Sequence, residues 1–123
     1  MRETVVNYFT DKEESIISIL VALGMRSNSA KVLVFLSSTE ITTSRQIERG
    51  TDLRQPDVSL AIKDLTARGW VRAMQDSPSR KGRPRKIYSL SMSVPEIIGT
   101  ITTERDKAVR HQLALVRRIK EYC

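Results

Sequence analysis

The chain has 123 residues, of which 21 are Lys or Arg and 14 are Asp or Glu, so its formal net charge is +7. This length fits one domain with at most an appended helix, and 40% hydrophobic with 28% charged residues is typical of a folded protein. One cysteine, Cys123, and one histidine, His111, exclude an intrachain disulfide, a cysteine metal cage and any site that needs two imidazoles.

No segment predicts membrane insertion or export. The longest apolar stretch, residues 16–25, is interrupted by Ser18 and is far shorter than the roughly 20 residues of a spanning helix. The first residues include an acid and lead into no apolar signal-peptide region. We therefore expect a cytoplasmic protein.

The positive charge is concentrated in one part of the chain. Residues 1–40 contain four basic and five acidic residues, whereas residues 41–123 contain 17 basic and nine acidic residues. Six basic residues fall between Arg72 and Lys86, opposed only by Asp76. A local cluster of this kind indicates a polyanionic partner.

Hydrophobic spacing predicts two helices at the start of the chain. The first covers about residues 11–23, and Gly24 follows as its stop signal. The second begins near Asn28 or Ser29, and its inward residues are expected to be Ala30, Val32, Leu33, Phe35 and Leu36.

A tight pair of helices follows. The third helix is short, opens with a capping box of Thr43 and Gln46, and is expected to end at Gly50. The fourth has Pro56 in its first turn and ends at Gly69. Its apolar stripe consists of Val58, Ile62 and Leu65.

Two short apolar runs, residues 70–74 and 87–90, predict a β-hairpin with a long tip. A second capping box, Ser93 with Glu96, then starts a long C-terminal helix. This order predicts a mostly α chain with a small β-hairpin. The expected architecture is a winged helix-turn-helix DNA-binding domain over residues 1–92, followed by a C-terminal dimerisation helix over residues 93–123.

The fourth helix is the candidate for reading DNA, because the second helix of a helix-turn-helix enters the major groove. Opposite its apolar stripe lies a slim polar face that includes Ser59 and Lys63. At the leading end of the helix, Gln55 suits adenine and Arg54 suits guanine or phosphate. An ordinary amphipathic surface helix would show the same face, so the helical wheel alone leaves both interpretations open. The candidate recognition residues are Arg54, Gln55, Pro56, Asp57, Ser59, Leu60 and Lys63, with Thr43, Ser44 and Arg45 on the positioning helix.

The basic tip of the hairpin is the second candidate DNA contact. Gly82 allows close approach and Pro84 favours an extended backbone, so Arg83 between them is suited to a narrow A·T-rich minor groove. The segment resembles the AT-hook motif. A solvated basic loop or a localisation signal is the alternative, but the position after a helix-turn-helix favours DNA. The candidate wing residues are Arg80, Lys81, Gly82, Arg83, Pro84, Arg85 and Lys86.

Several short motifs resemble winged-helix transcription regulators. The opening of TrmB-type archaeal regulators is similar to residues 23–25, 30–32, 35–36 and 45–47. The recognition-helix region of ArsR-type and MarR-type repressors is similar to residues 55–59, Leu65 and residues 69–71. Residues 82–84 with Tyr88 and Leu90 resemble their wing. The resemblance covers about residues 20–92 and implies operator binding by a homodimer, with residues 54–68 as the base-reading helix. No inducer is carried over from the resemblance, because no cysteine pair like that of metal-sensing ArsR members occurs and the chain is too short for the sugar-binding domain of TrmB members. Whether a small-molecule effector acts on the protein stays open.

The C-terminal helix carries a near-heptad apolar seam that Arg105 and Gln112 interrupt. This pattern favours homodimerisation, and intramolecular packing in a monomer is the alternative. The candidate interface residues are Ile98, Ile101, Ala108, Gln112, Leu115, Ile119 and Tyr122.

Taken together, the sequence predicts a sequence-specific double-stranded DNA-binding transcription regulator that acts as a homodimer. We expect no enzyme, metal site, cofactor or membrane partner, because no phosphate loop or ligand cluster occurs and Asp57 and Asp64 are interpreted as surface charges. The alternative is a winged-helix adaptor in a transcription or replication assembly. Binding of single-stranded RNA is a third hypothesis, disfavoured because only six aromatic residues are available for stacking.

Overall fold

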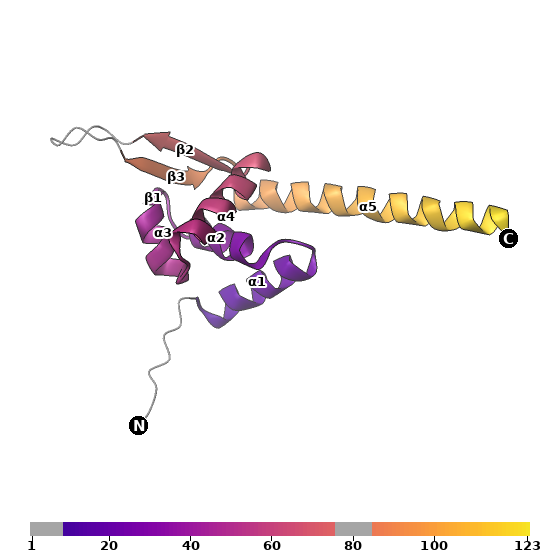
Figure 1. Cartoon of the computed structure of the whole chain (residues 1–123), viewed down its shortest axis with the longest axis horizontal. Helices are drawn as coiled ribbons and strands as arrows, with labels where there is room; N and C mark the ends of the chain where they lie inside the picture. The colour runs from indigo at the N-terminus through magenta and orange to yellow at the C-terminus, as the bar shows by residue number, and fades with distance from the viewer. Residues whose placement is uncertain (1–8, 76–84) are drawn as a thin grey trace, which may run out of the picture. The chain divides into compact units, whose positions relative to one another are not determined.

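The computed structural model describes residues 9–75 and 85–123, which fall into two compact units, Met1–Met92 and Ser93–Cys123 (Figure 1). The second unit is the single helix α5 (Val94–Tyr122). The elements of the first unit are α1 (Asp11–Ala22), α2 (Ser27–Ser37), β1 (Thr42–Thr43), α3 (Ser44–Thr51), α4 (Gln55–Ala67), β2 (Val71–Gln75) and β3 (Lys86–Leu90). The predicted order of elements is confirmed, with β1 as an addition.

Local side-chain caps fix where the helices begin. At α3 the Thr43 hydroxyl accepts from the Gln46 N–H at 3.2 Å, and the Gln46 side chain accepts from the Thr43 N–H at 2.9 Å. At α5 the same exchange joins Ser93 and Glu96 at 3.2 and 3.1 Å. Both predicted capping boxes are therefore confirmed, and a third, which was not predicted, spans Thr10–Glu13 at the start of α1.

Glycines in the left-handed region end two of the helices, as predicted. Gly24 follows α1 with φ of 104°, and Gly69 follows α4 with φ of 81°. After α4 the N–H of Gly69 donates to the Thr66 carbonyl at 3.0 Å, and the N–H of Trp70 donates to the Leu65 carbonyl at 3.1 Å. This pair of bonds is the Schellman closure, which satisfies carbonyls that the helix itself leaves free.

The prediction that Gly50 ends α3 is wrong. The helix continues to Thr51, and Asp52 adopts the left-handed conformation with φ of 57°. Gly50 serves packing instead, because a Cβ at this position would overlap the ring of Phe35 on α2. The absence of a side chain thus lets α3 approach α2 closely, and Asp52 makes the turn into α4.

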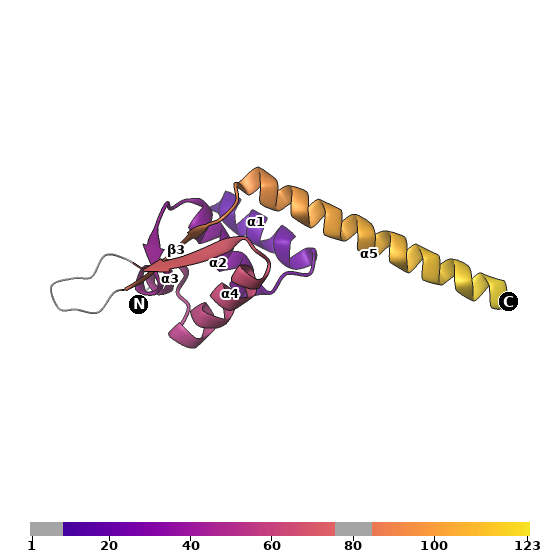
Figure 2. The same cartoon turned by 90° about the horizontal axis from the view of Figure 1, so that it is seen from above.

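Helix α2 is the centre of the first unit, since α1, α3 and α4 all pack against it (Figure 2). The predicted inward faces of α2 and α4 are confirmed except that Phe35 and Ile62 are only partly buried. Burial of the remaining apolar side chains provides the main driving force for this packing. The largest fully buried side chains are Trp70, Leu36, Ile47, Leu65, Val32, Val58 and Ser29.

The sheet is antiparallel with the order β1-β3-β2, so β3 is its central strand. Tyr88 on β3 lies opposite Thr42 on one side and Ala73 on the other. Both strands of the predicted hairpin are present, although β2 begins one residue later than expected because Trp70 belongs to the helix closure. Three helices in the helix-turn-helix arrangement followed by this hairpin form the predicted winged helix-turn-helix fold.

Candidate nucleic-acid interface

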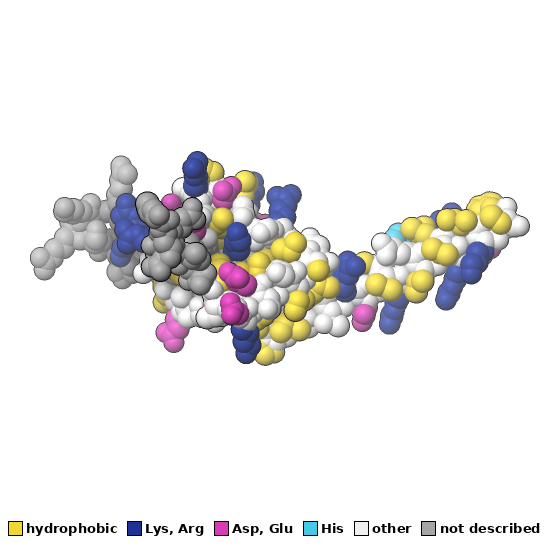
Figure 3. Space-filling model, turned by 90° about the horizontal axis from the view of Figure 1, so that it is seen from below, with side chains coloured by type: hydrophobic (Ala, Val, Ile, Leu, Met, Phe, Trp, Pro, Cys, Tyr) yellow, Lys and Arg dark blue, Asp and Glu magenta, His cyan; other side chains and the backbone are white. Residues whose placement is uncertain are grey.

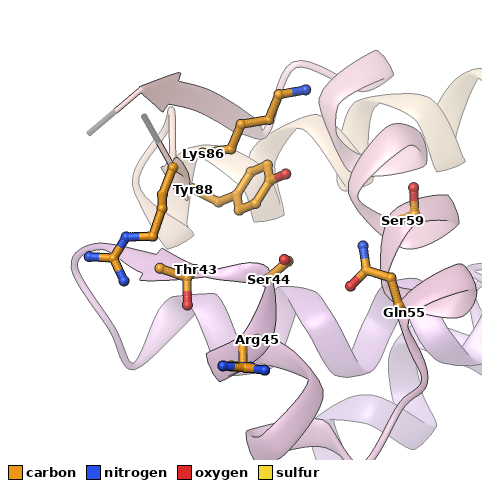
Figure 4. A pocket seen from close by; sticks show the side chains of 8 residues that line it. Thr43, Ser44, Arg45, Gln55, Ser59, Lys86 and Tyr88 are labelled. Atoms are coloured by element: carbon orange, nitrogen blue, oxygen red, sulfur yellow. The ribbon is translucent and has the colours of Figure 1, made fainter. Parts of the chain in front are cut away.

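An open groove of about 540 Å³ lies where α3, α4 and the hairpin converge (Figure 4). Its walls come from three segments that are distant in the sequence: the start of α3, the first turns of α4 and the beginning of β3. The residues that line it are Thr43, Ser44, Arg45, Gln55, Ser59, Arg85, Lys86 and Tyr88. None of these is acidic, so the groove is chemically suited to a polyanion.

The start of α3 forms one wall. The capping box at Thr43 holds the chain in an extended conformation and then starts the helix at Ser44. The first N–H groups of a helix have no intrahelical partner and carry the positive end of the helix dipole, which favours phosphate. Arg45 in this first turn is exposed and adds a full positive charge.

The first turns of α4 form the opposite wall. Gln55 and Ser59 are four residues apart and therefore share one face of the helix, and both are exposed. Farther along the same outer side, Leu60 is 60% exposed and Lys63 is also exposed. The predicted outer face of α4 is thus free of cover by the described residues of the first unit.

A hydrogen bond and an ion pair hold the opposite side of α4 against its neighbours. The buried hydroxyl of Ser29 on α2 donates to Asp64 Oδ2 at 2.7 Å, and Arg68 Nε pairs with Asp64 Oδ1 at 3.3 Å. The Arg68 guanidinium also lies over the ring of Trp70, 5.1 Å from its centroid. Asp64 is therefore a partly buried link between α2 and α4, and its interpretation as a surface charge is wrong.

The hairpin closes the groove from the third side. Side chains alternate along a strand, so Lys86 and Tyr88 on β3 point to the same face. Figure 4 shows the Tyr88 ring reaching from the sheet toward the side of the groove formed by Gln55 and Ser59. Arg85 lies immediately before β3 and lines the groove as well.

A second hollow of about 360 Å³ is lined by residues of α3 and of the neighbouring strands β1 and β3. Three arginines line it: Arg45, Arg49 and Arg85, with Arg49 one helical turn after Arg45. The other lining residues are Ile41, Thr42, Thr43, Gln46 and Ile87. The two hollows therefore share Arg45 and Arg85 and form one continuous basic region.

The structure brings together many, but not all, of the predicted site residues. Every lining residue of the groove except Tyr88 was a candidate from the sequence. Arg54, the N-cap of α4, is exposed outside the lining set, as are Pro56, Leu60 and Lys63, while Asp57 is partly buried. The wing candidates Arg80, Lys81, Gly82, Arg83 and Pro84 lie outside the described residues.

Tyr88 is the one lining residue of the groove that the sequence reasoning missed, and Arg49 is the basic residue of the second hollow that it missed. The strand alternation from Lys86 and the four-residue spacing from Arg45 are the signals that point to them. In residues 9–75 and 85–123 no group of three His, Cys, Asp or Glu side chains is placed to hold a metal ion. No helix in this described part is long and apolar enough to cross a membrane.

No protein-family profile and no curated protein sequence matches this chain. Solved structures do match. A possible transcriptional regulator from Methanosarcina mazei Go1 aligns with a TM-score of 0.65 at 17% identity, over 88% of this chain and 86% of that one. The archaeal chromatin protein TrmBL2, whose structure shows a novel mode of DNA binding, aligns with a TM-score of 0.66 at 14% identity, over 89% of this chain but only 40% of its own.

A complex of MepR from S. aureus with DNA also aligns, with a TM-score of 0.53 at 15% identity, over 91% of this chain and 90% of that one. Structural similarity at such low sequence identity is evidence about the fold alone. The fold agrees with the resemblance that the sequence motifs suggested. The chain has the winged helix-turn-helix fold of TrmB-type, MarR-type and related transcription regulators.

Proposed function

We propose that this protein is a transcription regulator that binds double-stranded DNA sequence-specifically as a homodimer, with α4 in the major groove and the hairpin on the minor groove or backbone. The observation that carries the proposal is the groove at which the start of α3, the outer face of α4 and the base of the hairpin meet with only basic, polar and aromatic lining. DNA binding by TrmBL2 and by MepR supports the same use of this fold.

The groove residues divide by chemistry into two groups. Arg45, Arg49, Arg85 and Lys86 are assigned to phosphates, which supply affinity and register but no sequence information. Base choice is assigned to the outer face of α4, where amide and hydroxyl groups suit base edges and an apolar side chain suits the thymine methyl. The recognition residues proposed for α4 are Arg54, Gln55, Pro56, Asp57, Ser59, Leu60 and Lys63, of which Asp57 is partly buried.

Homodimerisation through α5 is the second part of the proposal. Two copies would place two α4 helices about one DNA turn, ~34 Å, apart on a palindromic site. The exposed apolar side chains of α5 support this part. The candidate interface residues on α5 remain Ile98, Ile101, Ala108, Gln112, Leu115, Ile119 and Tyr122.

The decisive experiment is selection of bound duplexes from a random pool, followed by anisotropy titrations of the selected site. Gln55→Ala should lower the preference for one base pair by about 1–3 kcal/mol. Arg45→Ala should weaken all duplexes alike and reduce the slope of log affinity against log salt by about one. Arg26→Ala removes the same charge from an exposed position that does not line the groove, and it should change neither quantity.

The hairpin tip is tested in the same assay with Arg83→Ala. Loss of a minor-groove contact should weaken binding to sites with A·T flanks by about 1–3 kcal/mol and leave G·C-flanked sites less affected. Selection without enrichment of any sequence, together with affinity that does not depend on salt, would overturn the proposal. That combination would favour the adaptor hypothesis.

A further inference from the structure

Helix α5 carries large exposed apolar side chains, most of them between Val109 and Tyr122. Every residue from Thr102 to Cys123 is exposed, and along the helix large apolar side chains are between 41% and 84% exposed. Figure 3 shows these hydrophobic side chains gathered along the helix, with Lys and Arg side chains on its flank. Exposed apolar side chains gathered along one helix are typical of a contact with another macromolecule. The side chains are Ile98, Val109, Leu113, Leu115, Val116, Ile119 and Tyr122.

Four of these side chains, Ile98, Leu115, Ile119 and Tyr122, lie on a seam with coiled-coil spacing, whereas Val109, Leu113 and Val116 lie beside it. From Ile98 to Tyr122 the steps between seam residues alternate strictly between three and four, as in a heptad repeat. The a positions of the heptad are Ile98, Arg105, Gln112 and Ile119, and the d positions are Ile101, Ala108, Leu115 and Tyr122. A second copy of α5 is therefore the partner that fits the heptad pattern. The two helices could pair in parallel or in antiparallel direction.

A parallel pair places like groups against each other. In that arrangement each a residue faces its own copy, so Arg105 would lie opposite the partner's Arg105 in the seam. The flanking positions g and e would bring Glu104 against the partner's Val109 and Arg118 against the partner's Cys123. Charge repulsion in the seam and the lack of any opposite-charge flanking pair both disfavour the parallel direction.

We infer that two copies of α5 pair in antiparallel direction with their crossing point at Arg110. In this register every a residue faces a d residue of the partner over the full seam, which places Arg105 opposite the partner's Leu115 and Gln112 opposite the partner's Ala108. Glu104 then lies beside the partner's Arg118, and symmetry makes this ion pair twice. The two Arg105 side chains are ten residues apart along the axis, about 15 Å, instead of side by side.

This inference rests on the homodimer in the proposed function and adds the relative direction of its two α5 helices. The single cysteine provides a direct measurement, since Cys123 is exposed at the end of α5. In the antiparallel pair the two Cys123 residues are 26 positions apart along the axis, about 39 Å. In a parallel pair they lie at the same end, under about 20 Å apart.

The first test attaches a nitroxide spin label to Cys123 and measures the label separation by pulsed EPR, after light scattering has established the mass in solution. A dimer with a separation near 40 Å is expected. A dimer with a short separation would overturn the antiparallel direction alone. A monomer at all concentrations would overturn both the pairing and the homodimer, whereas DNA binding is measured separately and fails only if the groove assignment fails.

The second test reverses charges. Glu104→Arg alone, or Arg118→Glu alone, should weaken dimerisation roughly tenfold, because each replaces two attractions by two repulsions. The double variant should return to within about twofold of the wild type. Glu121→Arg changes the same charge away from the seam and serves as the matched control.

The double variant distinguishes the two directions. In a parallel pair Glu104 and the partner's Arg118 are 14 residues apart, about 21 Å, so exchanging their charges could not restore the affinity. Failure of the double variant to recover, with all variants equally helical by circular dichroism, would overturn the inferred register.

Discussion

The hydrogen bond between Ser29 and Asp64 joins α2 to α4, and its contribution to the free energy of unfolding can be predicted. Its two partners differ in their access to water: Ser29 is 1% exposed, whereas the Asp64 side chain is 27% exposed. In Asp64→Ala the Ser29 hydroxyl stays buried without an acceptor. In Ser29→Ala water can still reach the carboxylate that has lost its donor. The two substitutions remove the same bond, and we expect Asp64→Ala to be the more destabilising.

The expected loss of unfolding free energy follows from the strength of the Ser29–Asp64 hydrogen bond. A hydrogen bond to a charged group contributes about 1.5–3 kcal/mol, and a partly exposed i,i+4 ion pair such as Asp64–Arg68 adds only about 0.3–0.5 kcal/mol. Asp64→Ala should therefore lower the free energy of unfolding by about 2–3 kcal/mol. Ser29→Ala should lower it by about 1 kcal/mol, because water can still solvate the Asp64 carboxylate; the gain in helix propensity on substitution by Ala is similar at both positions. The double variant should lose less than the sum of the two.

Urea unfolding followed by circular dichroism measures these differences. All variants are compared at one protein concentration, because the stability of any protein that self-associates depends on its concentration. Thr66→Ala, on an exposed position of α4, is the control and should stay within about 0.5 kcal/mol of the wild type. If Ser29→Ala proved more costly than Asp64→Ala, or if the two losses simply added, the reasoning from burial would be refuted.

Three further predictions concern other positions. Gly50→Ala should destabilise by about 1–3 kcal/mol in the same unfolding assay, because the new Cβ meets the Phe35 ring; an unchanged midpoint would contradict the packing role. Asp52→Gly should stabilise by about 0.5–1 kcal/mol, since Gly adopts the left-handed conformation without strain, and a loss of stability would show that the Asp side chain is needed. The backbone N–H and the hydroxyl of Ser93 lower the pKa of Glu96, so this cap should contribute above the ordinary glutamate pKa and be lost as pH falls through the lowered value; an NMR titration in which Ser93→Ala leaves the Glu96 pKa unchanged would contradict it.

The parts of the fold that could be predicted are those set by neighbouring residues. The capping boxes at Thr43 and Ser93 and the stop at Gly69 each need only residues within one helical turn, and all three are confirmed. The apolar stripes of α2 and α4 are likewise local patterns, so their inner faces could be assigned from spacing alone.

The errors arise where distant residues decide the outcome. Gly50 reads as a helix stop in isolation, but its role is set by Phe35, which approaches from another helix. β1 consists of two threonines without any alternation, and it becomes a strand only because β3 provides hydrogen-bonding partners. In the sequence Asp64 looks like any exposed acid on a helix, because its hydrogen-bond partner Ser29 belongs to another helix, α2.

For the candidate site, the sequence predicted which residue types are present but not which of them share one groove. Leu60 and Lys63 belong to the same outer face of α4 as Gln55, yet only the first turns of the helix line the groove. The inner face holds the helix through buried contacts such as Val58, whereas Gln55 is exposed. Because the residues that pack α4 against the core differ from those that face solvent, changes at Gln55 should alter DNA recognition without altering the stability of the fold. A fold that separates the two in this way can acquire a new target sequence without repacking its core.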